Sequence, residues 1–463
     1  MEKRAWVSRF SLYFLLISST FGLGNLWRFP YVVQDNNGAI FLFIYFVFLF
    51  ILGTPLLISE LIMGKIKNSG TLKAYHEDAI SKERALKSSS LMNVFFLSSL
   101  KYYGYFSFAI CFLVLGYLSV VSGWVLYFLF FSTLSFFSPN AVNAETLLMT
   151  LHSQGWLQVL LAGVHLMVVS FLLRRSLQYK VKKWIGYLSP VLGGFLALLI
   201  YLSFSEFPLN EAYHFIFYPN FETFKLSSFA HAIGHIIFSL SIGIGVIVSF
   251  GSELKKEDYL PAFAFRVATL DGVYSILTAL LIIPLVFVVS IKVSGPELVF
   301  KVVPLFFQRI QGGGFFAVIF FIFLYLAAVG GTMALFQTQI QNFSENFDMR
   351  KKKSIQAILF IGLLLSIIPA LSSNFLDNYQ VSGPNILEQL DRLLVNWLLP
   401  IGAIFGSQIT RILLEKEVME EEFLDVNFPS AYVLLGHWKF ILKWGVPVVI
   451  IISLLLQAYE LLL

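Results

Sequence analysis

The chain carries the stretch SSTFGLGNLWRFP at residues 18–30, inside an apolar segment of roughly residues 10–33. A membrane-spanning helix needs about 20 such residues. The stretch nevertheless holds two glycines close together, and each costs about 1 kcal/mol in a helix interior. Small polar residues precede the glycines, and Arg28 and Pro30 follow them. This pattern predicts a membrane helix that unwinds near its middle, with the freed amides and carbonyls facing a polar cavity because lipid offers them no partners.

The composition of the whole chain also indicates a membrane protein. Of 463 residues, 58% are hydrophobic and only 13% are charged, whereas soluble domains have about 25% charged residues. This excludes a disordered chain, a disulfide scaffold and an ordinary soluble enzyme. The single cysteine, Cys111, cannot form an internal disulfide, and no cluster of cysteine and histidine has zinc spacing. The net charge of +5 is distributed as membrane orientation requires, so we expect no nucleic-acid partner.

Eleven apolar segments are long enough to span a bilayer. They cover approximately residues 10–33, 39–64, 100–136, 156–173, 184–204, 228–250, 262–291, 314–343, 354–372, 388–414 and 438–462. Most of the 32 lysines and arginines lie at alternate ends, on the side of the N-terminus, which predicts a cytoplasmic N-terminus and an outside C-terminus. We expect the third and eighth segments, which exceed one crossing, to tilt or to continue outside the bilayer.

Two connections and the first segment complete this topology. The polar segment 68–93 is predicted to be an amphipathic cytoplasmic connector. The first segment is not expected to be a cleaved signal peptide, because its apolar run continues past Ser18 and Ser19 to Pro30.

A second glycine pair lies in the sixth segment, in the stretch SLSIGIG at residues 239–245. Close packing through small residues is an alternative explanation for either pair alone. The first and sixth segments, however, each begin a unit of five, and an odd number inverts the second unit relative to the first. Matching interruptions in two such halves predict a transporter site at their interface. We therefore expect an all-α polytopic membrane fold with a 5+5 inverted repeat, broken helices 1 and 6, and one additional C-terminal span. The boundaries are 1–206, 207–416 and 417–463.

The residues from Gly22 to Tyr31 resemble the first-helix signature of the neurotransmitter:sodium symporter family. Further stretches that fit the family are 37–39, 53–55, Glu60 and 63–65 in the second helix, 119–124 in the third and 238–243 in the sixth. The resemblance extends through the tenth span, and eleven spans are similar to the shorter bacterial members. It implies sodium-coupled symport of an amino acid or related small solute by alternating access in the cytoplasmic (inner) membrane. It implies neither an enzyme nor an organic cofactor.

The resemblance implies a solute pocket between the two breaks. The solute carboxylate would meet the amides near Leu23 and Gly24, since a helix N-terminus carries about half a positive charge. The expected lining residues are Ser19, Leu23, Gly24, Val114, Phe238, Ser239, Ser241, Ile244 and Gly331. For Val114 and Phe238, ordinary core packing is the alternative.

The resemblance also implies a first sodium site, formed by the Thr20 carbonyl, Asn25, Ser239 and Asp271. All four offer oxygen, the ligand that hard cations prefer. A mid-span carboxylate costs roughly 2.5–3.5 kcal/mol and needs a partner. A bound cation is one partner for Asp271, and Arg266 is the alternative. The resemblance further suggests that Asp271 takes the place of a chloride ion.

Several charged or titratable residues resemble the family's gates. Arg28 and Asp391 match the pair that closes the outer side. His235 stands where the family commonly has glutamine, and because histidine titrates near neutrality we hypothesise pH-sensitive outer gating, the alternative being a neutral, hydrogen-bonded histidine. On the inner side, Lys3 or Arg4 is expected to pair with Glu345. Glu60 resembles the carboxylate that caps unwound backbone in the sixth span, the alternative being a charge facing water.

Two positions depart from the family pattern. The tyrosine that usually donates to the solute carboxylate falls on Leu118, and the neighbouring Tyr117 points about 100° away around the helix. The Thr-Ser pair of the second sodium site becomes Gly330 and Gly331. The ligands left for that site are the carbonyls of Ser18, Phe21 and Ala327 together with the two glycines. We therefore expect a weakened or absent second sodium site.

Two alternatives to a sodium-coupled symporter stay open. One is a homologue of the same fold with altered substrate or coupling, either single-ion or sensor-like and non-transporting. The other is a membrane enzyme that uses His231, His235 or Ser241. The sequence argues against it, because it contains no nucleophile elbow and no zinc motif.

Overall fold

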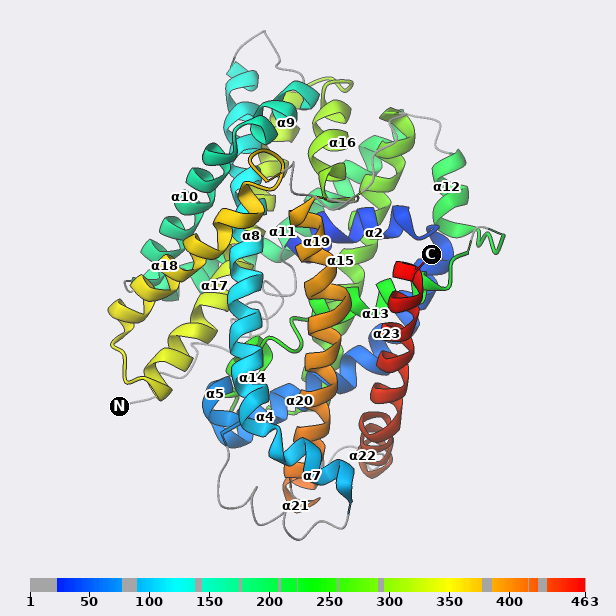
Figure 1. The fold of residues 1–463 in the computed structure, drawn as a ribbon. Coiled ribbons are helices and arrows are strands. Elements are labelled where there is room, and N and C mark those ends of the chain that lie inside the picture. The colour runs from blue at the N-terminus through cyan, green and yellow to red at the C-terminus, as the bar shows by residue number, and fades with distance from the viewer. Residues whose placement is uncertain are drawn as a thin grey trace.

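The architecture is all-helical in the part of the chain that the computed structural model describes (Figure 1). The described residues are 23–76, 90–137, 144–174, 177–206, 210–222, 224–255, 258–289, 295–376, 385–414, 416–423 and 431–462. Within these ranges there is no β-strand. This agrees with the expected all-α polytopic fold.

Helices occupy each of the eleven predicted segments. The first five correspond to η1 (Gly24–Arg28) with α2 (Phe29–Asp35); α3 (Ala39–Phe48), η2 (Leu49–Gly53) and α4 (Thr54–Lys67); α8 (Leu100–Phe137); α10 (Gly155–Arg174); and α11 (Leu177–Glu206). The sixth is α13 (Ser227–Ser239) with α14 (Val246–Gly251). The last five are α15 (Leu260–Val289); α17 (Gly313–Asn346); α18 (Lys351–Ala370); α19 (Ile386–Arg392), η5 (Leu393–Leu398) and α20 (Leu399–Leu413); and α22 (Ala431–Phe440), η6 (Ile441–Gly445) and α23 (Val446–Leu462).

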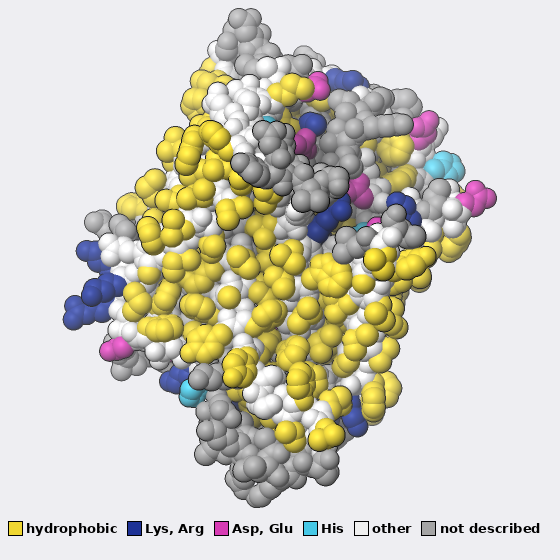
Figure 2. Space-filling view, in the orientation of Figure 1, with side chains coloured by type: hydrophobic (Ala, Val, Ile, Leu, Met, Phe, Trp, Pro, Cys, Tyr) yellow, Lys and Arg dark blue, Asp and Glu magenta, His cyan; other side chains and the backbone are white. Residues whose placement is uncertain are grey.

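Eight of the helices among the described residues are long and apolar enough to cross a membrane on their own. The sixth segment falls short because it is divided into two short helices, α13 and α14. The total of eleven spans therefore stays a prediction. The expected extra length is confirmed, since α8 has 38 residues and α17 has 34. Figure 2 shows a broad hydrophobic band across the middle of one face, with the charged side chains mainly at its margins.

Short helices lie at both ends of the bundle (Figure 1). At one end are α5 (Thr71–Ala74), α7 (Leu91–Ser98) and α21 (Lys416–Phe423). At the other are α9 (Ala144–Ser153), α12 (Asn210–Phe217), and α16 (Leu298–Phe307), which follows the turn η3 (Gly295–Glu297). The predicted connector 68–93 thus contains α5 and the start of α7, and its residues 77–89 lie outside the described part.

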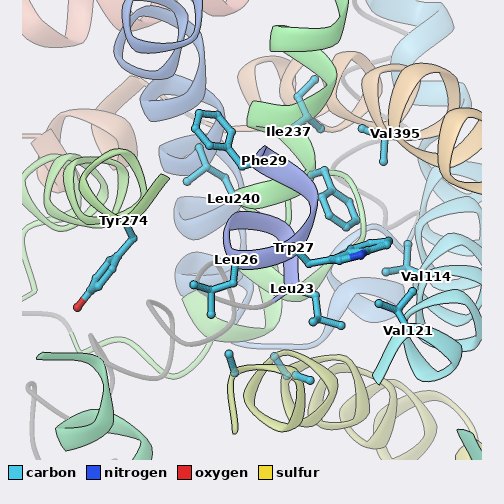
Figure 3. Close-up of a cluster of buried hydrophobic side chains, with 14 of the residues drawn as sticks. Leu23, Leu26, Trp27, Phe29, Val114, Val121, Ile237, Leu240, Tyr274 and Val395 are labelled. Atoms are coloured by element: carbon cyan, nitrogen blue, oxygen red, sulfur yellow. The ribbon is translucent and has the colours of Figure 1, made fainter. Parts of the chain in front are cut away.

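Two groups of helices flank the first and sixth segments. In one group α8 packs along α10, α17 and α18; in the other α4 packs against α14, α15 and α20. The described part of the first span is buried in the molecule, with Trp27 and Phe29 fully inaccessible. Figure 3 shows Leu23 and Trp27 extending from this helix toward Val114 and Val121 on α8. This arrangement places both glycine-containing segments at the centre of the molecule.

Candidate functional site

The sixth span is interrupted as the sequence predicted. Helix α13 ends at Ser239, and α14 does not begin until Val246. Between them, Ser241, Gly243 and Gly245 have φ values of 55°, 84° and 77°. Glycine adopts this left-handed region readily, but serine does so rarely. Since unusual backbone of this kind gathers at functional sites, the break marks the centre of the candidate site.

The backbone groups freed by the break are satisfied inside the protein. The Gly243 amide donates to Glu60 Oε1 at 2.7 Å, and the Thr71 hydroxyl donates to the Gly245 carbonyl at 3.0 Å. A Cβ atom on Gly245 would lie 2.1 Å from Thr71 Oγ1, so this position requires glycine. The predicted contact of Glu60 with the unwound segment is confirmed, and the alternative of a charge facing water is not, since Glu60 is buried.

The first break lies mostly outside the described residues. Ser18, Ser19, Thr20 and Phe21 all fall there, so the predicted unwinding and their site roles stay predictions. From Leu23 onward the chain is helical, with a π-helical turn over Gly24–Arg28. A Cβ atom on Gly24 would lie 3.4 Å from the Phe238 ring, so the first span approaches the sixth closely at this glycine.

A small cavity of about 40 Å³ lies where the first and sixth spans meet α8 and α17. The described residues that line it are Leu23, Gly24, Val114, Leu118, Phe238, Ser239, Ser241, Ile244, Val246, Ala328, Gly331, Thr332, Ala334 and Leu335. Every predicted lining residue within the described ranges is among them, which brings these residues together at one cavity.

Sequence reasoning missed the α17 side of this cavity apart from Gly331. Ala328, Thr332 and Leu335 share one helix face with it, because their spacing of three and four residues places them one above another. That periodicity, read from Gly331, was the signal that could have found them. Val114 and Leu118 are likewise four residues apart on α8.

Asp271 lies beside the cavity with its carboxylate buried in α15. It accepts hydrogen bonds from Asn25 Nδ2 at 2.7 Å, Tyr45 Oη at 2.8 Å and Ser239 Oγ at 3.1 Å. The donors are neutral side chains rather than the Arg266 guanidinium, which is exposed. Three of the four residues predicted for the first sodium site are therefore in one cluster.

The cluster also leaves one oxygen unused. Asn25 Oδ1 is buried and has no hydrogen-bond partner among the described residues. Buried polar atoms in native proteins normally have partners, so an orphaned amide oxygen next to a buried carboxylate needs an explanation. Carbonyl and carboxylate oxygens are the ligands of hard cations, and this donor set fits a sodium ion.

The region predicted for the second sodium ion is different. Ala327 and Gly330 are buried on α17, and Gly331 lines the cavity. The two glycines offer no side-chain oxygen. The next residue, Thr332, donates to the Ala328 carbonyl at 2.9 Å, and its Oγ1 lies 2.9 Å from His165 Nε2. Among the described residues, the hydroxyl nearest in sequence to Gly330 and Gly331 is that of Thr332, and it already has two hydrogen-bond partners.

The predicted outer pair is in contact. Arg28 Nε lies 3.0 Å from Asp391 Oδ1, and Nη2 lies 3.2 Å from Oδ2. Tyr117 Oη donates to the same carboxylate at 2.6 Å and Tyr31 Oη at 3.1 Å. Tyr117, which points away from the solute position as its place on the helix predicts, therefore serves the ion pair. Sequence reasoning did not foresee this contact, because the partner is about 270 residues away.

His235 joins this network through Arg28. Its Nδ1 lies 3.2 Å from Arg28 Nη1. Because arginine can only donate, this imidazole nitrogen must accept. The geometry therefore favours the alternative of a neutral, hydrogen-bonded histidine. It also argues against a nucleophile–base pair of His235 and Ser239, since the Ser239 hydroxyl donates to Asp271.

The inner side is described only in part. Lys3 and Arg4 lie outside the described residues, so their predicted pairing with Glu345 stays a prediction. Glu345 accepts a hydrogen bond from the Gly70 amide at 2.7 Å and another from Gln341 at 3.0 Å. These bonds tie the end of α17 to the start of α5.

A second, larger cavity of about 450 Å³ lies on the other side of the Arg28–Asp391 pair. Its described lining is rich in charge and includes Asp35, Lys225, Glu388, Arg392 and Glu460. The ion pair therefore stands between a large polar cavity and the small central one.

A helical membrane protein with a central cavity at a broken helix, separated from a polar vestibule by a buried ion pair, is a carrier of the inverted-repeat type. The pattern of the sodium:neurotransmitter symporter family matches residues 3–146 and 133–461 of this chain. The chain belongs to that family.

Individual relatives are similar to this chain over nearly its full length. The chain is 27% identical over 453 residues to the uncharacterized sodium-dependent transporter YhdH of Bacillus subtilis, covering 97% of this chain and 96% of the relative. It is 25% identical over 458 residues to an uncharacterized sodium-dependent transporter of Haemophilus influenzae, covering 97% of each. Among solved structures, MhsT in complex with L-phenylalanine is similar with a TM-score of 0.86 and 26% identity, covering 98% of this chain and all of MhsT.

Proposed function

We propose that this protein is a symporter that couples the uptake of an amino acid, or a close relative of one, to sodium. The observation that carries the proposal is the Asn25–Ser239–Asp271 cluster, which holds a buried carboxylate and an unpaired amide oxygen beside the central cavity. The similarity to sodium-dependent transporters and to MhsT with L-phenylalanine supports the choice of ion and solute.

Sodium binds first in this scheme. An arriving cation offsets the Asp271 charge, takes Asn25 Oδ1 as a ligand and draws the Ser239 hydroxyl from the carboxylate toward the ion. Since Asn25 belongs to the first span and Ser239 to the sixth, the ion joins the two interrupted helices. The Thr20 carbonyl is the fourth predicted ligand. Sodium is a transported partner here, so its release on the inner side resets the site.

The solute then completes the cavity. Its carboxylate meets the amides near Leu23 and Gly24, where the helix dipole favours negative charge. Leu118 cannot donate a hydrogen bond, and Tyr117 is committed to Asp391. The head group is therefore held by backbone amides and by the bound sodium. The ion pair of Arg28 and Asp391 closes above it.

The proposal includes a single coupling ion. At Gly330 and Gly331 no side-chain oxygen is available to a second sodium. One charge crossing about 100 mV contributes roughly 2.3 kcal/mol, or about 50-fold accumulation. A one-ion carrier therefore concentrates its solute less than a two-ion carrier.

The remaining parts of the proposal concern placement. The protein lies in the cytoplasmic membrane with its N-terminus inside and its C-terminus outside, as the lysine and arginine distribution predicts. Spans 1–5 (1–206) and the inverted spans 6–10 (207–416) form the carrier, and residues 417–463 add the connector and the last span. Its partners are a small solute and the lipid bilayer, and it uses neither nucleic acid nor an organic cofactor.

Uptake into proteoliposomes tests the proposal. The full-length protein is reconstituted, and a panel of radiolabelled amino acids is offered with an inward gradient of sodium, of potassium or of protons alone. We expect accumulation of at least one solute with the sodium gradient only, and its collapse when a sodium ionophore is added. Accumulation driven by protons or potassium alone would contradict sodium coupling.

The same experiment separates the sensor-like alternative. Binding of a solute that depends on sodium, but with no flux under any gradient, would identify a receptor rather than a carrier. Leu118 and the two glycines are the residues that favour this second candidate.

A further inference from the structure

One residue in the wall of the central cavity is held from behind by a histidine that does not reach the cavity. Thr332 on α17 lines the cavity, whereas His165 on α10 is absent from the described lining. Thr332 Oγ1 lies 2.9 Å from His165 Nε2 and 2.9 Å from the Ala328 carbonyl oxygen. Both side chains are buried.

The donors and acceptors of this pair can be assigned. A threonine hydroxyl has one proton, and here it goes to the Ala328 carbonyl. His165 Nε2 must therefore carry the proton that joins the imidazole to Thr332. The other ring nitrogen, Nδ1, is buried and has no partner among the described residues. A buried acceptor left unsatisfied is destabilising, so the bond to Thr332 is the one polar interaction that justifies a histidine at this position.

The bond changes what the cavity offers to a solute. With its proton given to the Ala328 carbonyl and a lone pair taken by His165, the Thr332 hydroxyl is already engaged within the protein. Its neighbours along the α8 and α17 sides, Val114, Leu118 and Leu335, are aliphatic. No charged residue occurs among the described residues that line the cavity, and the Ser239 hydroxyl is bonded to Asp271. The wall formed by α8 and α17 is therefore apolar, and the remaining hydroxyl of the described lining, that of Ser241, belongs to the sixth span.

We propose that His165 is a positioning residue that makes the cavity selective for solutes with an apolar side chain, by holding the Thr332 hydroxyl out of it. The inference rests on the proposed transport of an amino acid and names the class of side chain. A solute hydroxyl entering this wall loses its bonds to water and finds no partner. A hydrophobic site rejects an isostere that carries a hydroxyl by up to about 100-fold.

Isosteric pairs of competitors measure this selectivity. Valine and threonine differ only by a methyl group in place of a hydroxyl, and 2-aminobutyrate and serine differ in the same way. The inhibition constants of all four are measured against sodium-dependent binding of the best radiolabelled solute, using full-length protein in proteoliposomes. For the wild type we expect each apolar member to bind about 10- to 100-fold more tightly than its hydroxyl partner.

Four variants test the role of the pair. His165→Leu removes one of the two bonds that hold the Thr332 hydroxyl and leaves only the Ala328 carbonyl; we expect the hydroxyl to turn inward and the apolar preference to fall at least fivefold. Thr332→Val alone keeps the preference, and the double variant H165L/T332V restores it because no hydroxyl is left to turn. His165→Gln retains a donor to Thr332 and is expected to keep the wild-type ratio.

The outcomes separate the two proposals. If no amino acid binds with sodium, the proposed function fails and takes this inference with it. If amino acids bind but both pairs show ratios near one, only the inference is overturned. It is also overturned if H165L leaves the ratio unchanged, or if T332V fails to restore the ratio lost in H165L, because general loosening of the wall would then be the cause. Should H165L not fold, T332V alone decides: a higher apolar preference in that variant would show that the wild-type hydroxyl already faces the cavity, and this would overturn the inference.

Discussion

The two sides of the central cavity that the family uses for cations differ sharply in this chain. On one side, Asn25, Ser239 and Tyr45 converge on the buried carboxylate of Asp271. On the other, the same fold presents Gly330 and Gly331, which have no side-chain oxygen. The helix that carries the glycines still lines the cavity. Among the described residues, the fold therefore presents a cluster of side-chain oxygens on one side only, and this contrast is the basis of the proposed single coupling ion.

The buried charge of Asp271 explains why its side of the cavity cannot lose its polar side chains as the glycine side has. A carboxylate inside the membrane is costly, and three neutral donors offset that cost only in part. In the proposed function a cation completes the balance, whereas Gly330 and Gly331 carry no charge that needs one. Asp271 and the glycine pair are thus opposite designs within one cavity.

Replacing Asp271 by asparagine should have the largest effect on this contrast. Asp271→Asn keeps the shape but removes the negative charge next to the ion. Two unit charges 4 Å apart interact by about 4 kcal/mol at an effective dielectric constant of 20. If half of that is lost, the apparent sodium affinity falls about 30-fold. The measurement is the sodium dependence of solute uptake in chloride-free buffer.

Chloride and a neighbouring serine provide the controls for Asp271→Asn. Tyr45 Oη lies 3.0 Å from Ser275 Oγ, so hydroxyl groups surround the lost charge and can hold an added anion. We expect chloride to restore part of the affinity in Asp271→Asn and to leave the wild type unchanged. Ser275→Ala disturbs the same cluster without removing charge and should cost less than threefold. Equal losses in the two variants would contradict a special role for the carboxylate.

Restoring hydroxyls on the glycine side should have the next largest effect. The double variant G330T/G331S supplies the two missing oxygen ligands. If a second sodium then binds and moves, the Hill coefficient for sodium rises from about one toward two. The accumulation ratio at about 100 mV then rises by up to about 50-fold. Uptake is followed at several sodium concentrations under a clamped potential, with G330A/G331A as the control for added bulk. An unchanged Hill coefficient with intact solute binding would show that the missing hydroxyls are not the reason for single-ion coupling.

The sequence predicted more of this site than of its surroundings, for physical reasons. Glycine pairs in apolar segments are visible because glycine has no place in a membrane helix without a cause, and the break at Ser241–Gly245 was confirmed on that basis. Span positions follow from hydropathy alone. Three residues predicted for the first sodium site do lie together; a buried carboxylate requires partners, and the family resemblance named them.

Contacts between distant helices could not be predicted in this way. The bond from Tyr117 to Asp391 and the pairing of His165 with Thr332 join residues far apart in the chain. A single sequence shows which face of a helix a residue occupies, but not which helix lies opposite. Thr332 was not among the predicted lining residues, and nothing in its own segment indicates a histidine behind it.

Replacing His235, which lies beside the outer ion pair, should have the smallest effect on solute affinity. The imidazole lies between the Arg28 guanidinium at 3.2 Å and the ring of Tyr45, whose centroid is 5.7 Å away. It therefore connects the outer ion pair with the Asp271 side of the cavity. A proton on His235 would place a second positive charge against Arg28 and weaken outer closure, so a charged His235 would make acid pH lower the solute affinity.

Because Nδ1 accepts from arginine, we expect His235 to stay neutral through the working range. His235→Gln, whose side-chain oxygen can accept the same bond, should change the solute affinity less than threefold. It should also leave the pH profile of uptake unmoved between pH 5.5 and 8. The matched control is His231→Gln, one turn earlier on α13, where Nδ1 lies 2.9 Å from Asn36 Oδ1 and Nε2 lies 3.7 Å from a Glu460 oxygen. A profile that shifts in His235→Gln but not in His231→Gln would establish pH-sensitive gating through Arg28, and any pH dependence measured for Asp271 variants would then have to be corrected for it.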